Sequence, residues 1–294
     1  MRKLLLKKYK IDSIEDPHSR GLAEFHDLLG RAFGTGEVEP LERFKKELEG
    51  NKLPDARAKF LCLVVRDPIQ DNRVINGAYA SAHKEGVLAV RFTVTETEEM
   101  NPAKINYRGQ GIGRLADDEL IRQAQEYMQA HGGELHSTIA ECVGTSEQYW
   151  NKFGMKRMYI QTGPQSYQEI YYELPHFGEW NPETGEMVDA LPTPQREHLQ
   201  IATTKPVTPE SVREIAEPLW REWYVHDQSE FSGTGPQEAH RKFVMETVFQ
   251  DRIINPLEGE QLVSLTKAER SAMQAKGMTF SSHIDDEGLE PQTT

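Results

Sequence analysis

Three glycines at alternate positions, within residues 107–114, stand directly before an amphipathic helical pattern. Because glycine has no Cβ, such a segment can curl until successive backbone N–H groups point into one concavity. The first turn of a helix adds N–H groups without partners inside the helix, together with the positive end of its dipole. Arg108 and Arg114 flank the turn. These residue types at this spacing predict a site for a pyrophosphate or a similar anion.

The elements that would hold this turn follow from hydrophobic spacing. Helices are predicted over residues 18–33, 40–50, 112–131 and 146–153. Strands are predicted over residues 3–11, 60–66, 73–82, 87–97, 135–142, 155–161 and 169–174. The order is therefore β-α-α-β-β-β-α-β-α-β-β. The three strands before the turn are joined by short turns, which predicts an antiparallel meander.

The glycine turn has three interpretations. The plainest is a helix N-terminus with no ligand, which the flanking arginines and the long helix disfavour. A second is a dinucleotide site, because residues 111–116 fit G-x-G-x-x-A and Glu141 ends the next strand, where a ribose-binding acid would lie. That fingerprint needs a strand running into the first glycine, yet residues 98–107 intervene. The preceding strands also form hairpins, whereas a dinucleotide fold needs βαβ units.

The third interpretation is a resemblance. Arg108-Gly109-Gln110-Gly111-Ile112-Gly113 resembles the R/Q-x-x-G-x-G/A signature of the GCN5-related N-acetyltransferase (GNAT) superfamily. Residues 149–155, Tyr-Trp-Asn-Lys-Phe-Gly-Met, are similar to that family's aromatic-x-x-x-Gly-aromatic/apolar segment. The resemblance covers about residues 1–175. It implies an α/β (α+β) fold: a mixed, mostly antiparallel sheet flanked by helices.

The resemblance implies that acetyl-CoA or another acyl-CoA is the donor, with no metal. Backbone N–H groups of the turn would hold the pyrophosphate. The pantetheine would run along the strand of residues 87–97, where the sheet splays beside residues 135–142. A backbone group of this strand would donate a hydrogen bond to the acyl carbonyl. The residues assigned to the donor are Thr93, Val94, Arg108, Gly109, Gln110, Gly111, Ile112, Gly113 and Arg114.

Direct transfer of an acyl group to an amine needs a base, and often an acid that protonates the departing thiolate. In the family the acid is commonly a tyrosine four residues before the glycine of the second segment. Trp150 stands there, and its indole N–H is no practical acid. The adjacent Tyr149 is the candidate if the helix is locally shifted, and the alternative is that the thiolate leaves unassisted or by way of water. Glu96 and Glu141 are the candidate bases, with a solvated strand-end charge as the alternative for each. His83 and His136 are held in reserve.

The resemblance also implies an amine acceptor, either a small molecule or a peptide. Acceptor recognition in the family commonly involves the two early helices and the final strand pair. Phe33 and Glu37 lie near the loop between those helices, and Tyr171 lies near the final hairpin. The alternatives are that Phe33 belongs to the core and that Tyr171 is an ordinary strand residue. Residues 98–106 are an inserted loop, longer than the family's usual connection, that would overhang the acyl site and could restrict or enlarge the acceptor pocket.

Composition limits the class of protein. The 294 residues are 37% hydrophobic and 28% charged, which describes a soluble globular chain. A net charge of −13 disfavours binding to nucleic acid or to anionic membranes. Two cysteines far apart predict buried thiols in a reducing compartment, and no apolar stretch is long enough to span a membrane. We therefore expect a cytoplasmic protein.

Beyond residue 175 the composition changes. Residues 176–206 are predicted to be a linker or extended arm, residues 207–278 an α-helical extension, and residues 279–294 a flexible tail. Helices are expected to begin at Thr208-Pro209, at Pro236 and at the capping box Thr266–Glu269, the last ending near Gly277. This region could cover the acceptor cleft, form a homodimer interface or dock an acyl carrier protein.

Three functional hypotheses follow. The first is an acyltransferase that moves an acetyl or other short acyl group from acyl-CoA to an amine by direct attack. The second keeps the fold but uses an acyl carrier protein donor or other acyl-thioester chemistry, which the missing tyrosine and the inserted loop motivate. The third is a regulatory module that binds CoA without turnover, which Trp150 at the acid position motivates.

Overall fold

The chain forms two compact units in a computed structural model. The structure describes residues 8–33, 38, 40–53, 56, 58–142, 147–174, 179–181, 186–188, 195–220 and 261–281. The first unit comprises the described residues up to His136, together with β9 (Glu179–Asn181) and β10 (Glu186–Val188), which pair antiparallel with each other. The second unit comprises the other described residues.

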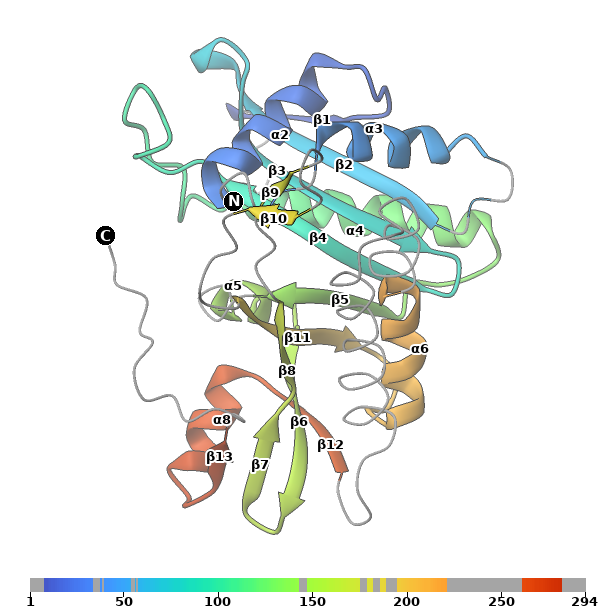
Figure 1. The fold of residues 1–294 in the computed structure, drawn as a ribbon, viewed down its shortest axis with the longest axis vertical. Coiled ribbons are helices and arrows are strands. Elements are labelled where there is room, and N and C mark those ends of the chain that lie inside the picture. Colours follow the sequence, from blue (N-terminus) through green and yellow to red (C-terminus); the bar gives the residue numbers. More distant parts are fainter. Residues whose placement is uncertain are drawn as a thin grey trace. The chain divides into compact units, whose positions relative to one another are not determined.

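The sheet of the first unit is an antiparallel meander (Figure 1). Its strands are β1 (Lys10–Ser13), β2 (Ala58–Asp67), β3 (Arg73–His83) and β4 (Val87–Thr95), each antiparallel to the next. A 3₁₀ turn, Pro68–Gln70, joins β2 to β3, and a tight turn ending at Gly86 joins β3 to β4. Antiparallel neighbours throughout confirm the predicted meander and contradict the βαβ units of a dinucleotide fold.

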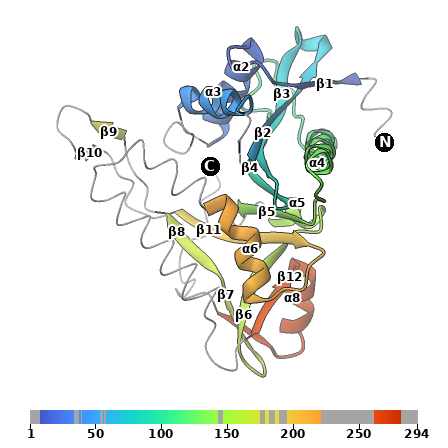
Figure 2. The same ribbon diagram turned by 90° about the vertical axis from the view of Figure 1, so that its right-hand side faces the viewer.

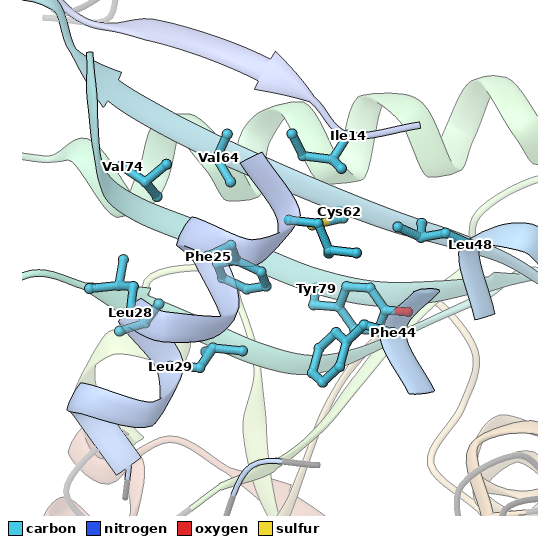
Figure 3. Close-up of a cluster of buried hydrophobic side chains, with 12 residues drawn as sticks. Ile14, Phe25, Leu28, Leu29, Phe44, Leu48, Cys62, Val64, Val74 and Tyr79 are labelled. Carbon is cyan, nitrogen blue, oxygen red and sulfur yellow. The ribbon is translucent and has the colours of Figure 1, made fainter. Parts of the chain in front are cut away.

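Helices cover both faces of this sheet (Figure 2). α2 (Arg20–Phe33) and α3 (Leu41–Gly50) pack on one face, and α4 (Ile112–Ala130) packs on the other. The core under α2 and α3 is built from apolar residues at helical and strand spacing (Figure 3). It includes Phe25, Leu28, Leu29, Phe44, Leu48, Cys62, Val64, Val74 and Tyr79. Cys62 is a free, buried thiol, as predicted. α4 buries the predicted stripe that includes Leu115, Leu120, Ala124 and Met128.

β4 contains a bulge at Arg91. Tyr79 of β3 pairs with Phe92, whereas the next residue, Ala80, pairs with Val90, so Arg91 is the extra residue on β4. A bulge of this kind bends the strand and redirects the side chains beside it. It therefore sets the position of residues 92–95, the part of β4 expected to lie beside the donor.

A buried ion pair holds this bulge to α3. Arg91 Nη1 donates to Glu47 Oε1 at 2.8 Å, and the Tyr79 hydroxyl donates to Glu47 Oε2 at 2.5 Å. Burial alone would raise the pKa of Glu47, but Arg91 and Arg43 outweigh it and hold that pKa below its usual value. Glu47 is therefore a charged anchor between α3 and the bulge.

The sheet of the second unit is organised around β11 (Gln195–Thr203). β11 is antiparallel to β5 (Ser137–Cys142) along one edge and to β6 (Lys156–Gly163) and β8 (Tyr171–Leu174) along the other. β7 (Ser166–Glu169) and β12 (Gln261–Leu265) pair with opposite edges of β6. β13 (Thr279–Ser281) runs parallel to β7.

β11 lies where a linker or extended arm is expected, within residues 176–206. The strand escapes notice in the sequence because polar residues occupy buried positions. His198 is 7% exposed, and Gln200 is fully buried. Their polar side chains interrupt the apolar pattern by which a central strand is normally recognised.

The helices of the second unit are α5 (Glu147–Asn151), α6 (Pro209–Trp220) and α8 (Lys267–Gln274). α6 begins as predicted, with Thr208 Oγ1 accepting a hydrogen bond from the Ser211 N–H at 3.2 Å. The predicted capping box at Thr266 is also present. In the described part of the C-terminal region, β12 and β13, which the sequence does not predict, flank α8. The helix expected from Pro236 lies outside the described residues.

The predicted fold class is confirmed: a mixed, mostly antiparallel arrangement of strands flanked by helices. The predicted order holds through β6, but residues 166–174, where one strand is predicted over 169–174, contain two strands, β7 paired with β6 and β8 paired with β11. Within the described part of the chain, no helix combines the length and the apolar character that crossing a membrane requires.

The close packing of α2 on β3 gives a stability test at Gly77. A Cβ at this position would lie 2.4 Å from Phe25 Cδ2 and 2.9 Å from the Leu63 carbonyl oxygen. We expect Gly77→Ala to lower the free energy of unfolding by about 2 to 3 kcal/mol, because the added methyl group would overpack the core. The matched control is Gly30→Ala, also in the first unit, where nothing lies within 4 Å of an added Cβ. That change should raise stability by about 0.5 kcal/mol. Urea denaturation measures both, and equal stability of the two variants would contradict the packing.

Candidate functional site

The glycine turn begins α4, where the sequence predicts it. Gly109 and Gly111 have φ angles of 77° and 80°, and Gly111 is the N-cap of the helix. Residues other than glycine rarely adopt this left-handed backbone conformation, so the path of the turn depends on both glycines. Arg108, Gly109, Gln110 and Arg114 are exposed, whereas Ile112 and Gly113 are buried. The turn therefore presents its arginines and its first residues to solvent.

Tyr107 anchors the start of the turn. Its ring is 1% exposed, and its hydroxyl donates to Asp67 Oδ2 at 2.8 Å. Burial, followed by this hydrogen bond, raises the pKa of Tyr107, so the hydroxyl stays protonated. Tyr9 packs edge-on against the Tyr107 ring at 6.3 Å and donates from its hydroxyl to Gln110 Oε1 at 3.0 Å. The turn is thus attached to the end of β2 and to the residue before β1.

The first turn of α4 is suited to an anion. Among the described residues, no side chain caps it. Its N–H groups and dipole therefore act together with exposed Arg108 and Arg114. Arg114 Nε lies 3.8 Å from Asp118 Oδ1, one helical turn further on. Pairs that are largely exposed to solvent in this way are weak.

Thr93 and Val94 of β4 face opposite sides of the sheet. Thr93 Oγ1 donates at 3.1 Å to Asp117 Oδ1 of α4, and Asp117 is 4% exposed. Val94 is 5% exposed and packs into the core under α2 and α3. Thr93 therefore attaches β4 to α4. Asp117 was not singled out from the sequence, because the run Asp117-Asp118-Glu119 has the composition of a solvated helix face.

Glu96 lies just after β4 and is fully buried. Its carboxylate accepts hydrogen bonds from Arg73 at 2.6 Å, from Arg31 at 2.8 Å and from Asn101 at 2.7 Å. Burial alone would raise the pKa of Glu96, but these donors, Arg73 first among them, outweigh it and lower that pKa. A carboxylate held in its charged form by two arginines is a weak acceptor of a proton from an amine.

Glu96 also closes the loop that leads to the glycine turn. Its N–H donates to the Ile75 carbonyl at 2.8 Å, and its own carbonyl accepts from the Tyr107 N–H at 3.4 Å. Arg31 reaches the same loop, donating to the Met100 carbonyl at 2.9 Å. Residues 96–107, which contain the expected insertion, therefore start and end beside each other.

Tyr149 and Trp150 lie on α5, in the second unit. Trp150 is 8% exposed, and Tyr149 is half-buried with its ring edge-on to Trp150 at 5.1 Å. α5 ends in a Schellman motif, in which Met155 N–H donates to the Trp150 carbonyl at 3.2 Å and Gly154 N–H donates to the Asn151 carbonyl at 3.1 Å. Gly154 has the required φ of 77°. The predicted aromatic-x-x-x-Gly segment thus caps a helix.

The remaining candidates divide into described and undescribed residues. Phe33 packs against Phe92 at 5.9 Å, at the edge of the core, which is the alternative expected for it. Glu37 lies outside the described residues. Glu141 and Tyr171 lie in β5 and β8, and their side chains are outside the described part. The roles of Glu37, Glu141 and Tyr171 stay predictions.

His83 is a poor base in this fold. It is 3% exposed, and its Nε2 lies 2.9 Å from Ser81 Oγ. Burial lowers the pKa of His83 to about 4, so the ring is neutral at neutral pH. Among the described residues, no group of three His, Cys, Asp or Glu side chains is arranged to hold a metal ion.

Comparison with known proteins gives fold neighbours only. No family model and no curated protein matches the chain. It is similar to the GNAT-family acetyltransferase from Streptococcus pneumoniae, with 16% identity, a TM-score of 0.40, and coverage of 67% of this chain and 99% of that one. It is similar to Ard1 from Thermoplasma volcanium, with 9% identity, a TM-score of 0.39, and coverage of 68% and 99%. It is also similar to a GNAT-family acetyltransferase from Staphylococcus aureus, with 12% identity, a TM-score of 0.36, and coverage of 67% of this chain and 100% of that one.

The contacts of Glu96 predict a large loss of stability when its charge is removed. We expect Glu96→Gln to lower the free energy of unfolding by about 2 to 4 kcal/mol, because Arg31 and Arg73 lose a shared buried anion. Exposed Glu98, two residues further along the same loop, provides the control Glu98→Gln, which should change stability little. Thermal and urea denaturation measure both changes. A Glu96→Gln variant as stable as the Glu98→Gln control would show that the contacts of the Glu96 carboxylate contribute nothing to stability.

Proposed function

We propose that this chain is an N-acyltransferase of the GNAT type, which moves an acetyl or other short acyl group from an acyl-CoA to an amine. The observation that carries the proposal is the glycine turn at the N-terminus of α4, which follows an antiparallel meander. A turn of this kind binds pyrophosphate. Because β2, β3 and β4 are antiparallel, a dinucleotide-binding fold is disfavoured and CoA is the better ligand.

The donor is held mainly by backbone. The N–H groups of residues 110–114 bind the pyrophosphate, and exposed Arg108 and Arg114 add positive charge. The space around Gly109 supports this arrangement, since nothing lies within 4 Å of a Cβ built there. The pantetheine runs along the backbone near Thr93 and Val94. Their side chains are engaged with α4 and the core, so the backbone is what they offer to a ligand.

The reaction is a direct attack. The amine nitrogen bonds to the thioester carbon, the C–S bond breaks, and the sulfur leaves with the electron pair. A base first takes one proton from the ammonium so that the neutral amine can attack, and Tyr149 gives a proton to the departing thiolate. The nitrogen loses its second proton as the amide forms, and that proton restores the Tyr149 hydroxyl. Glu96 is saturated by Arg73, Arg31 and Asn101, so we assign it to positioning, and Glu141 becomes the candidate base. The acceptor is an amine of a small molecule or a peptide.

A second candidate function is a module that binds CoA without turnover. Two observations favour it. Trp150 occupies the position of the usual acid, and Glu96 is held as an ion-paired carboxylate. In this case acyl-CoA binds at the glycine turn, and no amine accelerates thiol release.

Donor binding can be tested with two glycines that flank α4, one before it and one after it. Gly109 and Gly132 both have a φ of 77° and open space where a Cβ would lie, but they stand at opposite ends of the helix. Calorimetric titration should show that acetyl-CoA binds and that NADH does not compete. Gly109→Ala should weaken binding about tenfold, because the left-handed conformation costs a side chain about 1 to 2 kcal/mol.

Gly132→Ala carries the same backbone strain and should leave the dissociation constant for acetyl-CoA unchanged. Equal affinities for the two glycine variants would contradict a donor site at the turn. Absence of acetyl-CoA binding at millimolar concentration would exclude acetyl-CoA as the donor.

Turnover can be tested by measuring thiol release from several acyl-CoAs in the presence of an amine library. We expect release to require an amine. Tyr149→Phe and Glu141→Gln should each lower kcat by about 100-fold, with the dissociation constant for acyl-CoA unchanged. Tyr127→Phe on α4 is the control and should retain full activity. If acyl-CoA binds but no amine promotes release, the binding module is the correct function.

A further inference from the structure

α5 is too short to be stable by itself. It has five residues, whereas isolated helices of fewer than about 12 to 15 residues are marginal in water. Contacts with the rest of the second unit must therefore hold it in place. Two of these contacts come from α8, at sequence separations of 116 and 123 residues. They lie at the two ends of α5.

The first contact is a bidentate ion pair between Arg270 and Glu147, at the start of α5. Arg270 Nη1 and Nη2 donate to Glu147 Oε1 and Oε2, both at 3.0 Å. Glu147 is 3% exposed, so this pair is shielded from solvent. Arg270 Nη1 also donates to the Tyr159 hydroxyl of β6 at 2.5 Å. Paired, planar hydrogen bonds of this kind define both the position and the orientation of their partners.

The second contact is at the end of α5. The Lys267 N–H, in the first turn of α8, donates to Asn151 Oδ1 at 3.1 Å. The same Asn151 side chain donates from Nδ2 to the Met155 carbonyl at 2.8 Å, which stabilises the turn after α5. Lys156 and Glu269 add an exposed ion pair at 3.0 Å beside it.

α8 is itself held against the sheet of the second unit. β12 precedes it and pairs with β6, and β13 follows it and pairs with β7 (Figure 1). Phe280 of β13 stacks on Tyr167 of β7 at 5.0 Å. Strand pairing on both sides of α8 gives it a defined position from which it can hold α5.

We propose that residues 261–281 are a positioning element for α5, in which Arg270 and Lys267 hold the two ends of the helix and thereby orient Tyr149. Loss of these contacts would let the helix fray, because its own backbone hydrogen bonds cannot sustain it. That part of the proposal is mechanical. The consequence for acyl transfer rests on the proposed function, in which Tyr149 protonates the thiolate.

Hydrogen exchange tests the mechanical part. The N–H groups of residues 152–155 bond to carbonyls of α5, so their exchange reports its opening. In Arg270→Ala they should exchange about tenfold faster or more. The variant should still fold, since Arg157 Nη2 remains 3.2 Å from Glu147 Oε2. Lys276→Ala, an exposed change just after α8, is the control. Amides in α4 should exchange at the wild-type rate in both variants.

Lys267→Pro provides a second, milder variant. Proline lacks an N–H but is well tolerated at the first position of a helix, so the bond to Asn151 is lost while α8 is kept. Thr266, which would precede the proline, has a ψ of 162°, a conformation that proline permits. The N–H groups of residues 152–155 should again exchange faster, by about threefold.

The kinetic measurement separates positioning from mere stability. In Arg270→Ala, kcat should fall about tenfold or more while the dissociation constant for acyl-CoA stays unchanged. Exchange at the wild-type rate at residues 152–155 in both Arg270→Ala and Lys267→Pro would overturn the proposal. Faster exchange in Arg270→Ala with an unchanged kcat would overturn it as well. If the wild-type protein binds no acyl-CoA, the proposed function fails, and the exchange rates still decide whether α8 holds α5.

Discussion

Two arginines and an asparagine surround the carboxylate of Glu96, a buried charge directly after β4. A buried carboxylate is tolerated only when it is paired and hydrogen-bonded, so these contacts must form together. Arg73 belongs to β3, Arg31 to α2, and Asn101 to the loop that leads to the glycine turn. One charge thus joins the sheet, a covering helix and the loop. The start of α4 is placed by this junction, because the Tyr107 N–H bonds to the Glu96 carbonyl.

The glycines of the turn have few conformational restraints of their own, so buried neighbouring residues define its position. Tyr107 is attached to Asp67 at the end of β2, and Thr93 attaches β4 to Asp117 of α4. An anion site built from backbone N–H groups needs such support, because a shift of a fraction of an ångström misdirects several donors together. The exposed residues of the turn contribute charge, and the buried residues around it contribute geometry.

Local features of the sequence predicted the parts of the fold that depend on local physics. Helical spacing, the glycine turn with positive φ and the capping box at Thr266 all follow from neighbouring residues. Contacts between distant residues were not predictable in this way. The pairing of Glu96 with Arg31 spans 65 residues, which made a structural carboxylate resemble a candidate base. β11 was missed for a related reason, since His198 and Gln200 are polar residues buried in a sheet.

Burial on α5 bears on which aromatic residue can act as an acid. Trp150 is 8% exposed, and its carbonyl accepts the bonds that end the helix, so residue 150 is part of the packing of α5. A hydroxyl at that position would have to be taken out of water, which is costly without a partner. Tyr149 is half-buried and packs on both Trp150 and Phe153 at 5.1 and 5.3 Å, so its ring is oriented while part of it stays accessible. In this helix the deeply packed residue and the half-buried tyrosine are therefore neighbours, so the packing role falls to position 150 and not to position 149.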